Sequence, residues 1–395
     1  MNLSTKTGLI PRNNWDYGAF DLVKTLSNSF TKNNIAPNIA KYFDEPPVFT
    51  GSGRASLYAL LKSLDLPPDA KVGVPLFCCT VVFDAICRAG LRPVFIDSGM
   101  HDFNLSPDEL KRKRSECSAV VPVHMFGNPC DMDAINAVAN GMPIIEDCAQ
   151  SIFSMYKGKK TGTLSTASFF SFRCGKYISA GEGSAVFCRD DGLRKKVENL
   201  ARSFGEWTLP RSLVHCAATF MKATLYNRPW YGTLGYPLGK RLDKKLNLTA
   251  KDGFSTDKIA PGDLALANAR VPAYREKIER QRQNAQKLRE AIHAKDILLP
   301  SENRDCVSNW YQFALRFDTA QKRDAMAAHL FTKGIDTAKY LDTVVQDATE
   351  RFGYTKGSCP NTEILSKTVL LVPIHYFLRD RDIRHIARSI NQFVT

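Results

Sequence analysis

Short apolar runs and longer amphipathic segments alternate along the chain from about residue 50. The apolar runs predict strands at 71–77, 92–97, 118–125 and 142–147. The segments between them have helical spacing at 80–90 and 131–141, and a third helix is predicted after Ser106, a typical N-cap followed by Pro107. Apolar strands separated by helices indicate a mostly parallel sheet covered on both faces, and therefore an α/β fold.

The chain beyond residue 260 repeats this alternation on a smaller scale. A long helical stretch covers 263–295, with a heavily charged face and an expected kink at Pro272. A strand at 310–317, a helix ending at Gly334 and a closing helix at 379–394 follow. These elements predict a second, smaller α/β domain.

Residues 204–250 have a different composition, in which apolar and aromatic residues are mixed with basic ones. The basic residues are Arg211, Lys222, Arg228, Lys240, Arg241, Lys244 and Lys245. We interpret this segment as an insertion or arm. The chain then divides into an N-terminal arm or helical segment (1–50), a large domain (51–203), a basic aromatic insertion (204–260) and a small C-terminal domain (261–395).

Composition places the protein in the ordinary globular class. Of its 395 residues, 44% are hydrophobic and 24% are charged. The N-terminal stretch lacks the apolar core of a signal peptide, and the sequence has no apolar run long enough to span a membrane. The eleven cysteines include no CxxC pair and no Cys/His cluster at zinc spacing. We expect a cytoplasmic protein with reduced thiols and no metal site.

The formal net charge of +14 favours an anionic partner: phosphates, nucleotides, nucleic acid or an anionic membrane surface. No zinc finger, basic-region heptads or RNP-type strand accompanies this charge, so nucleic acid is not expected as a partner. A basic surface that is merely solvated explains the charge equally well.

Chemistry-bearing residues follow the predicted strands, where ligands bind in parallel α/β sheets. His124, Asp147 and Gln150 lie at or just beyond strand ends. Two further strands, 167–172 and 183–190, flank Lys176, which therefore lies in a tight connection between buried strands. The glycines of "GSGRAS" precede a helix whose free N–H groups can hold a phosphate, but the motif alone is weak evidence.

Together, an amine on a connecting loop, a carboxylate at a strand end and a phosphate-binding helix start are what pyridoxal phosphate (PLP) requires. The lysine must lose its proton, which desolvation and nearby positive charge favour, and it then binds the cofactor's aldehyde covalently. The carboxylate keeps the pyridine nitrogen protonated, so that the ring can accept electrons from the substrate.

The sequence also resembles the DegT/DnrJ/EryC1/StrS family of PLP-dependent sugar aminotransferases. The resemblance runs from about Gly51 to the C-terminus, and five ordered stretches carry it: "GSGRASLYALLKSLDL", "VPLFCCTVVFDAICRAGLRPVFID", "VPVHMFGNPCDMDAI", "PIIEDCAQS" and "FFSFRCGKYISAGEGSAVF". It implies the type I fold of PLP-dependent transferases, which resembles aspartate aminotransferase, with a large domain and a smaller C-terminal one.

The resemblance also assigns roles to single residues. Lys176 matches the lysine that binds the cofactor and moves the proton, and Asp147 the carboxylate that pairs with the pyridine nitrogen. Gln150 matches the glutamine at the ring oxygen, and Ser171 the serine at the phosphate. The usual phosphate-binding helix start is occupied by Gly53, Arg54 and Ala55.

Three positions depart from the family pattern. Arg54 stands where a small hydroxyl residue is usual, and its guanidinium could clamp the phosphate. Cys79 stands where an aromatic side chain usually stacks on the cofactor, so stacking comes from elsewhere, with His124 and Phe77 as candidates. "TDKIAPGD" replaces the family's partner-subunit motif, where Lys258 could substitute for an arginine.

Because lysine rather than histidine occupies position 176, the resemblance implies amino transfer rather than elimination of a hydroxyl. L-Glutamate is the expected donor, a ketone on a nucleotide-linked deoxysugar is the expected acceptor, and a homodimer with shared active sites is the expected assembly. Two alternatives stay open: a regulatory member without turnover, and a PLP enzyme for a cyclitol or lipid-linked ketone. The segment 204–250 could accordingly contact either an anionic membrane surface or the partner subunit.

Overall fold

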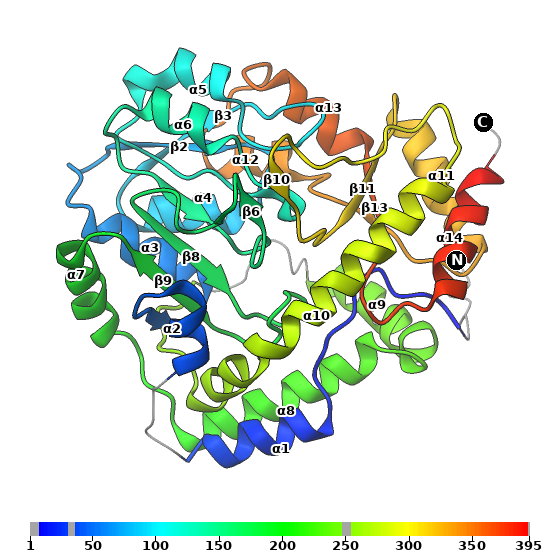
Figure 1. Ribbon diagram of the computed structural model, residues 1–395, viewed down its shortest axis with the longest axis horizontal. Helices are drawn as coiled ribbons and strands as arrows, with labels where there is room; N and C mark the ends of the chain where they lie inside the picture. The colour runs from blue at the N-terminus through cyan, green and yellow to red at the C-terminus, as the bar shows by residue number, and fades with distance from the viewer. Residues whose placement is uncertain (1–7, 31–35, 247–253, 394–395) are drawn as a thin grey trace.

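A mixed sheet forms the centre of the larger part of the molecule (Figure 1). The computed structural model describes residues 8–30, 36–246 and 254–393. A four-stranded and a three-stranded sheet join through bridges between Val120 and Ile144 and between Val123 and Asp147, giving the order β3-β2-β4-β5-β8-β9-β1. The strands are β1 (Val48–Thr50), β2 (Lys71–Pro75), β3 (Arg92–Ile96), β4 (Ala119–Val120), β5 (Ile145–Asp147), β8 (Ala167–Ser171) and β9 (Ser184–Cys188).

The sheet is parallel except at β9, which pairs antiparallel with both of its neighbours. A parallel connection needs a crossover of a dozen or more residues, usually through a helix. The β8–β9 connection (172–183) contains no helix and carries Lys176, and β9 runs back antiparallel along β8. The predicted type I fold with a mostly parallel central sheet is confirmed.

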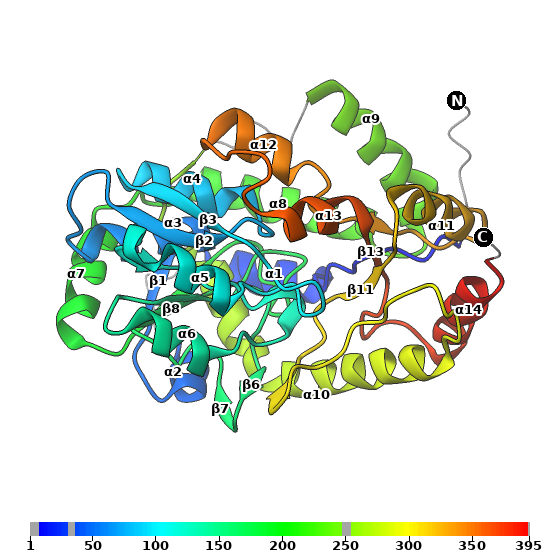
Figure 2. The ribbon, with the colours of Figure 1, turned by 90° about the horizontal axis from the view of Figure 1, so that it is seen from above.

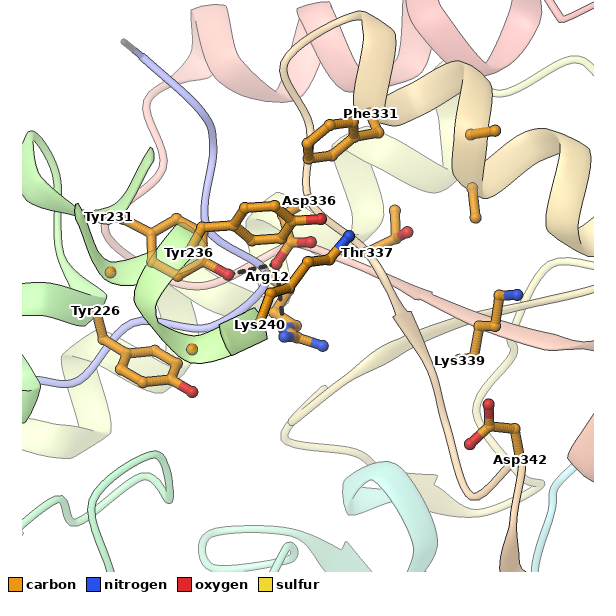
Figure 3. Close-up of a pocket in the computed structure, with 14 residues that line it drawn as sticks. Arg12, Tyr226, Tyr231, Tyr236, Lys240, Phe331, Asp336, Thr337, Lys339 and Asp342 are labelled. Carbon is orange, nitrogen blue, oxygen red and sulfur yellow. Dashed lines mark hydrogen bonds and ion pairs between the residues drawn. The ribbon is translucent and has the colours of Figure 1, made fainter. Parts of the chain in front are cut away.

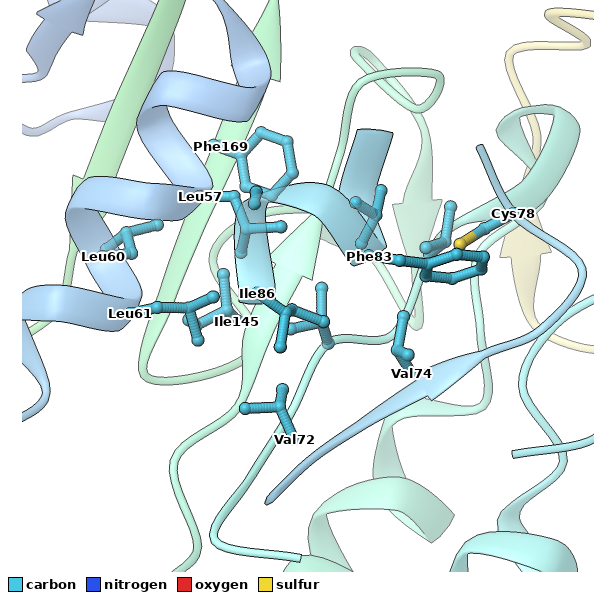
Figure 4. Packing of buried hydrophobic residues seen from close by; sticks show 14 of the residues in the cluster. Leu57, Leu60, Leu61, Val72, Val74, Cys78, Phe83, Ile86, Ile145 and Phe169 are labelled. Atoms are coloured by element: carbon cyan, nitrogen blue, oxygen red, sulfur yellow. The ribbon is translucent and has the colours of Figure 1, made fainter. Parts of the chain in front are cut away.

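Helices cover both faces of the sheet, as the apolar strands predict. One face packs against α3 (Gly53–Ser63), α4 (Thr80–Arg88) and α7 (Asp191–Arg202). Figure 4 shows part of this core, in which Leu57 and Leu61 of α3 and Phe83 of α4 pack near Val74 and Ile145 of the sheet. The other face packs against α2 (Pro37–Phe43), α5 (Pro107–Lys113), α6 (Met132–Ala139) and part of α10 (Pro261–Ala291).

The predicted helices after Ser106 and at 80–90 and 131–141 correspond to α5, α4 and α6. The Ser106 hydroxyl accepts a hydrogen bond from Glu109 N–H at 3.4 Å, as an N-cap does. The strand predicted at 118–125 is much shorter: regular pairing ends at Val120, a single bridge remains at Val123, and the short helix η2 (Met125–Gly127) follows. A further short helix, η1 (Arg114–Glu116), follows α5.

The smaller domain is built on an antiparallel sheet with the order β11-β13-β12. Its elements are β11 (Phe313–Arg316), α11 (Ala320–Thr332), β12 (Ala338–Lys339), α12 (Val344–Arg351), α13 (Pro360–Thr368), β13 (Val369–Val372) and α14 (Asp380–Asn391). Helix α10 contributes to the cores of both parts, and it continues through Pro272 rather than ending there. A minor sheet with the order β10-β6-β7 contains β6 (Met155–Tyr156), β7 (Lys159–Lys160) and β10 (Cys306–Val307).

The predicted arm is mostly helical between 209 and 246. It contains α8 (Leu209–Tyr226), the π-helical turn η3 (Tyr231–Gly235) and α9 (Tyr236–Leu246), while 247–253 lies outside the described residues. Helix α8 packs beside α1 (Ala19–Asn28) along one edge of the molecule, and α9 lies near α11 at the small domain (Figures 1 and 2). Among the described helices, none is both long enough and apolar enough to cross a membrane.

Candidate active site

A cavity of about 140 Å³ opens at the carboxyl ends of β5 and β8. Its walls come from the start of α3, the start of α4 and the loop between β8 and β9. Seven of the residues that the sequence predicts for the site line it: Gly53, Arg54, Cys79, Asp147, Gln150, Ser171 and Lys176. The fold therefore gathers at one place residues that are more than 100 positions apart in the sequence.

Lys176 is held in the β8–β9 loop by backbone hydrogen bonds. Its own N–H donates to Arg173 O at 2.9 Å, and Cys174 N–H donates to Gly181 O at 2.9 Å. Gly181 has φ +104°, and a Cβ there would lie 2.6 Å from Asp263 Oδ1, so only glycine fits. The Lys176 amine lies 4.9 Å from the centre of the Tyr311 ring, which orients it by a cation–π contact.

Asp147 ends β5 and is buried at the base of the cavity. Its Oδ1 accepts a hydrogen bond from Ala149 N–H at 2.9 Å. Burial raises the pKa of Asp147, while the Ala149 hydrogen bond and the charge of Lys176 act in the opposite direction. A buried carboxylate with so little compensation is suited to accept a positively charged ligand group.

Gln150 and Ser171 also line the cavity. Gln150 Oε1 accepts from Phe126 N–H at 3.0 Å, and its Nε2 donates to the Tyr340 hydroxyl at 3.2 Å. Ser171 is the last residue of β8, and its hydroxyl accepts from Arg173 N–H at 3.4 Å. The hydroxyl of Ser171 therefore keeps its own hydrogen free to donate to a ligand oxygen.

The first turn of α3 forms another wall of the cavity. Ser52 is its N-cap, and the Ser52 hydroxyl accepts from Ala55 N–H at 3.3 Å. Ala55 is fully buried and does not line the cavity, whereas the backbone N–H groups of Gly53 and Arg54 have no protein acceptor among the described residues. The helix start thus offers two N–H donors and the positive end of its dipole to an anion.

The cavity carries more positive than negative side chains. Arg54, Arg173 and Lys176 line it together with the carboxylates Asp147 and Glu182. Arg173 Nε lies 3.5 Å from Glu182 Oε1. Burial raises the pKa of Glu182, and the nearby charge of Arg173 lowers it in part. This surplus of positive charge suits a phosphorylated ligand.

The family comparison agrees with this geometry. A family model described as the DegT/DnrJ/EryC1/StrS aminotransferase family matches residues 31–210 and 259–391. The chain belongs to this family. The resemblance found in the sequence and the aminotransferase activity it implies are confirmed, and so, at the level of the family, is PLP as the cofactor.

Relatives that match most of this aminotransferase are identical to it at about a quarter of the aligned positions. A pleiotropic regulatory protein of Geobacillus stearothermophilus is 28% identical over 352 residues, covering 87% of this chain and 83% of the relative. GDP-perosamine synthase of Escherichia coli O157:H7 is 25% identical over 345 residues, covering 87% and 84%. The solved structure of aminotransferase TlmJ from Streptoalloteichus hindustanus has a TM-score of 0.78 at 20% identity, covering 97% and 98% of the two chains, which shows the shared fold.

The aminotransferase cavity fits PLP by the chemistry of its donor set. The α3 start, Arg54 and Ser171 would hold the phosphate, Asp147 would pair with the ring nitrogen, and Lys176 would bind the aldehyde. When bound, PLP supplies an electron sink for the substrate's α-carbon. Lys176 would then hold and move the proton, because it is the amine that reaches this cavity.

His124 does not line this cavity, in contrast to the suggestion that it stacks on the cofactor. Its Nδ1 accepts from Cys130 N–H at 3.0 Å, so its Nε2 donates to Glu146 Oε2 at 3.0 Å. Glu146 also accepts from Gly162 N–H, Leu164 N–H and the Ser165 hydroxyl. His124, Glu146 and Cys148 lie close enough to hold a metal ion, but these hydrogen bonds already use the nitrogen and carboxylate lone pairs of the first two.

The structure also places Cys79 and Lys258, two of the positions that depart from the family pattern, and Phe77, the other candidate for stacking. Cys79 is the N-cap of α4 and lines the cavity, but Phe77 is buried against Phe103 and Phe126 instead. Among the described lining residues the one aromatic is Phe169 of β8. Lys258 forms an ion pair with Glu206 and does not reach this chain's cavity, so its role toward a partner subunit stays a prediction.

Sequence reasoning missed Arg173 and Glu182, although both lie within three to six residues of Lys176 in a stretch quoted for the resemblance. It also missed Tyr311 and Tyr340, which contact Lys176 and Gln150 from the small domain. Neither tyrosine has a local signal, because each is more than 100 residues from its partner in the sequence.

Proposed function

We propose that this protein transfers the amino group of L-glutamate to a ketone on a nucleotide-linked deoxysugar. The cytoplasmic synthesis of a surface polysaccharide, such as a lipopolysaccharide O-antigen, or of a glycoside would use such a product. The observation that carries the proposal is the presence of Lys176 and Asp147 in one cavity with a phosphate-binding helix start. Among the relatives, GDP-perosamine synthase supports a nucleotide-sugar acceptor.

A regulatory role without turnover is the second candidate, because one relative bears the name of a pleiotropic regulatory protein. Loss of the amine or of the carboxylate would favour that role. Both groups are present here and face the same cavity. We therefore infer an active enzyme.

An absorption spectrum with added PLP tests this function directly. We expect a band near about 420 nm that is lost in Lys176→Ala and moves toward about 330 nm when L-glutamate is added. A Lys195→Ala variant is the matched control, because Lys195 is an exposed lysine of α7 outside the cavity. A band that does not depend on Lys176, or that L-glutamate leaves unchanged, would favour the regulatory role.

A homodimer is part of the same proposal. Of the thirteen large hydrophobic side chains that are exposed in the described residues, ten lie within 20–30 and 209–238. Helices α1 and α8 hold most of them side by side, with Phe20 93% and Val214 70% exposed. An apolar face of this extent favours burial against a second copy of the chain.

Sedimentation of Val214→Glu with Met221→Glu tests the dimer, since these residues lie seven positions apart on one face of α8. We expect a dimer in the wild type and dissociation in the double variant. If the variant stays dimeric but no longer floats with anionic vesicles, the face contacts a membrane surface instead, as segment 204–250 also allows. The eleven cysteines are all free thiols, which supports a reducing compartment.

A further inference from the structure

A second and larger cavity, of about 530 Å³, lies between the arm and the small domain. We call it the arm pocket. Tyr226, Tyr236 and Lys240 of the arm and Arg12 of the N-terminal segment form one side. In Figure 3, Lys339 and Asp342 of the small domain lie across the opening from them.

The arm pocket is lined both by residues that match the family model and by residues that lie outside the match. Its small-domain wall lies within the stretch 259–391 that matches the family model, whereas Arg12 and the arm residues 226–240 lie outside both matched stretches. Two segments outside the family match, the N-terminal one and the arm, therefore meet the matched small domain at one place. A pocket of this origin is suited to recognise a part of the substrate that varies between family members.

An aromatic pair in the arm pocket joins Tyr236 of the arm to Phe331 of α11 in the small domain. The Tyr236 and Phe331 rings stack with their centres 5.1 Å apart and their planes at 30°. The Lys240 amine lies 4.8 Å from the centre of Tyr236 and 5.7 Å from that of Phe331. Planar bases bind such surfaces by stacking, and a cation above the rings adds attraction for an anion beside the base.

The wall behind this surface is fixed by a buried carboxylate. Asp336 accepts a hydrogen bond from the Tyr231 hydroxyl at 2.5 Å and lies 3.1 Å from Arg12 Nε (Figure 3). The charge of the Asp336 carboxylate is therefore balanced by Arg12 within the wall. The remaining N–H groups of the Arg12 guanidinium form a fork of the kind that binds phosphate oxygens.

Three cations line the arm pocket against the two acids Asp336 and Asp342. Lys339 lies 2.9 Å from Asp324, outside the pocket, and Arg12 is paired with Asp336. Among the residues whose side chains the structure describes, which leave out 242–246, no carboxylate lies within ion-pair distance of Lys240. A diphosphate would supply the counter-charge, and the exposed Asp342 at the rim could accept hydrogen bonds from ribose hydroxyls.

The arm pocket adjoins the cofactor cavity through one short segment. Lys339 ends β12, and Tyr340 follows it directly. The Tyr340 hydroxyl accepts from Gln150 in the cofactor cavity, while Lys339 lines the arm pocket. The Lys339–Tyr340 segment therefore lies between the arm pocket and the cofactor cavity, so the two cavities are neighbours.

We propose that the arm pocket binds the nucleoside diphosphate of the substrate. The base packs against the Tyr236–Phe331 pair, and the diphosphate lies on Arg12, Lys240 and Lys339. This inference rests on the proposed function, since it names the part of the acceptor that the arm recognises.

Titration calorimetry of the PLP-loaded full-length protein with UDP, GDP and dTDP tests the proposal. Gly239→Leu is the decisive variant: Gly239 lines the pocket, and an added Cβ meets nothing within 4 Å, so a larger side chain has room to project there. Leucine also favours a helix more than glycine does, so we expect a Tm at or above that of the wild type. Lys240→Ala is the second variant, and Lys195→Ala is the control.

We expect at least one nucleoside diphosphate to bind the wild type, at least about 10-fold weaker binding to Gly239→Leu and to Lys240→Ala, and unchanged binding to Lys195→Ala. Equal binding to the wild type and Gly239→Leu would overturn the proposal. The proposal would also be overturned if farnesyl diphosphate, but no nucleoside diphosphate, bound the wild type and Gly239→Leu prevented this binding. That result would assign the pocket to a lipid-linked substrate.

A parallel measurement keeps this result separate from the proposed function. Each protein is mixed with L-glutamate, because the change in the cofactor's absorbance reports the amine donor site without the arm pocket. A response to glutamate with no binding of any nucleoside diphosphate overturns the arm-pocket proposal alone. Nucleotide binding without a response to glutamate overturns the aminotransferase activity while supporting the pocket.

Discussion

His215 Nε2 lies 2.7 Å from Asp263 Oδ2, and this contact connects the arm to the loop that carries Lys176. The same Asp263 oxygen accepts from Glu182 N–H at 2.9 Å. Helix α8 thus supports the turn beside the cofactor cavity, although His215 itself does not line that cavity. Helix α8, most of which lies outside the stretches that match the family model, therefore helps to hold the loop of Lys176.

The His215–Asp263 contact should make the free energy of unfolding decrease as the pH rises. Burial lowers the pKa of His215, but the hydrogen bond and charge of Asp263 outweigh it, so the pKa is raised above its ordinary value. A raised pKa in the folded state stabilises the fold fully below about 6.5, and this stabilisation is lost as pH rises through the folded value. Thermal unfolding from about pH 5.5 to about 8.5 measures it. His215→Gln should flatten the profile, and an unchanged profile would contradict the role of His215.

Asp147→Asn should slow the reaction with L-glutamate by about 100-fold or more, because it removes the charge that would pair with the cofactor nitrogen. PLP should still bind through Lys176, so the band near about 420 nm should remain. Stopped-flow absorbance measures the rate. Asp133→Asn, an exposed aspartate of α6, is the control and should react at the wild-type rate. A wild-type rate in Asp147→Asn would remove Asp147 from the site.

The aromatic ring of Tyr311, rather than its hydroxyl, should contribute to PLP binding. Tyr311→Ala removes the ring beside the Lys176 amine and the hydrogen bond from its hydroxyl to Gly175 O at 2.8 Å. We expect about 10-fold weaker binding of PLP in Tyr311→Ala and a change within about 3-fold in Tyr311→Phe, which keeps the ring. Equilibrium titration with PLP gives both values. Equal losses in the two variants would assign the effect to the hydrogen bond instead.

Arg54→Gln should weaken PLP binding by about 10-fold or more if the guanidinium holds the phosphate. Pyridoxal without its phosphate should bind wild type and variant alike, which separates a phosphate contact from damage to the cavity. Arg88→Gln, on the exposed side of α4, serves as the control. If Arg54→Gln binds PLP as well as the wild type, the α3 backbone and Ser171 suffice.

Much of the site was predictable because its residues belong to local patterns. Asp147 and Gln150 follow an apolar strand, Lys176 lies between two strands, and Gly53 precedes a helix. The parallel sheet then brings such strand ends to one edge. Lys176 and Asp147 are thus in one cavity for reasons visible in the alternation of apolar and polar residues.

Other features needed the packed chain. Nothing near His124 in the sequence shows that Glu146 would use its ring in a buried network, which removes it from the cofactor cavity. The contacts of Tyr311 with Lys176 and of Tyr340 with Gln150 cross from one domain to the other.

The sequence by itself determined the α/β class and the PLP chemistry, and it predicted seven residues that line one cavity, because strand ends, caps and glycine turns act over a few residues. The tertiary structure decided which distant groups complete that cavity, and it created the arm pocket from Arg12, the arm and the small domain. Contacts between segments hundreds of residues apart depend on how whole helices pack, and no short-range pattern records that packing.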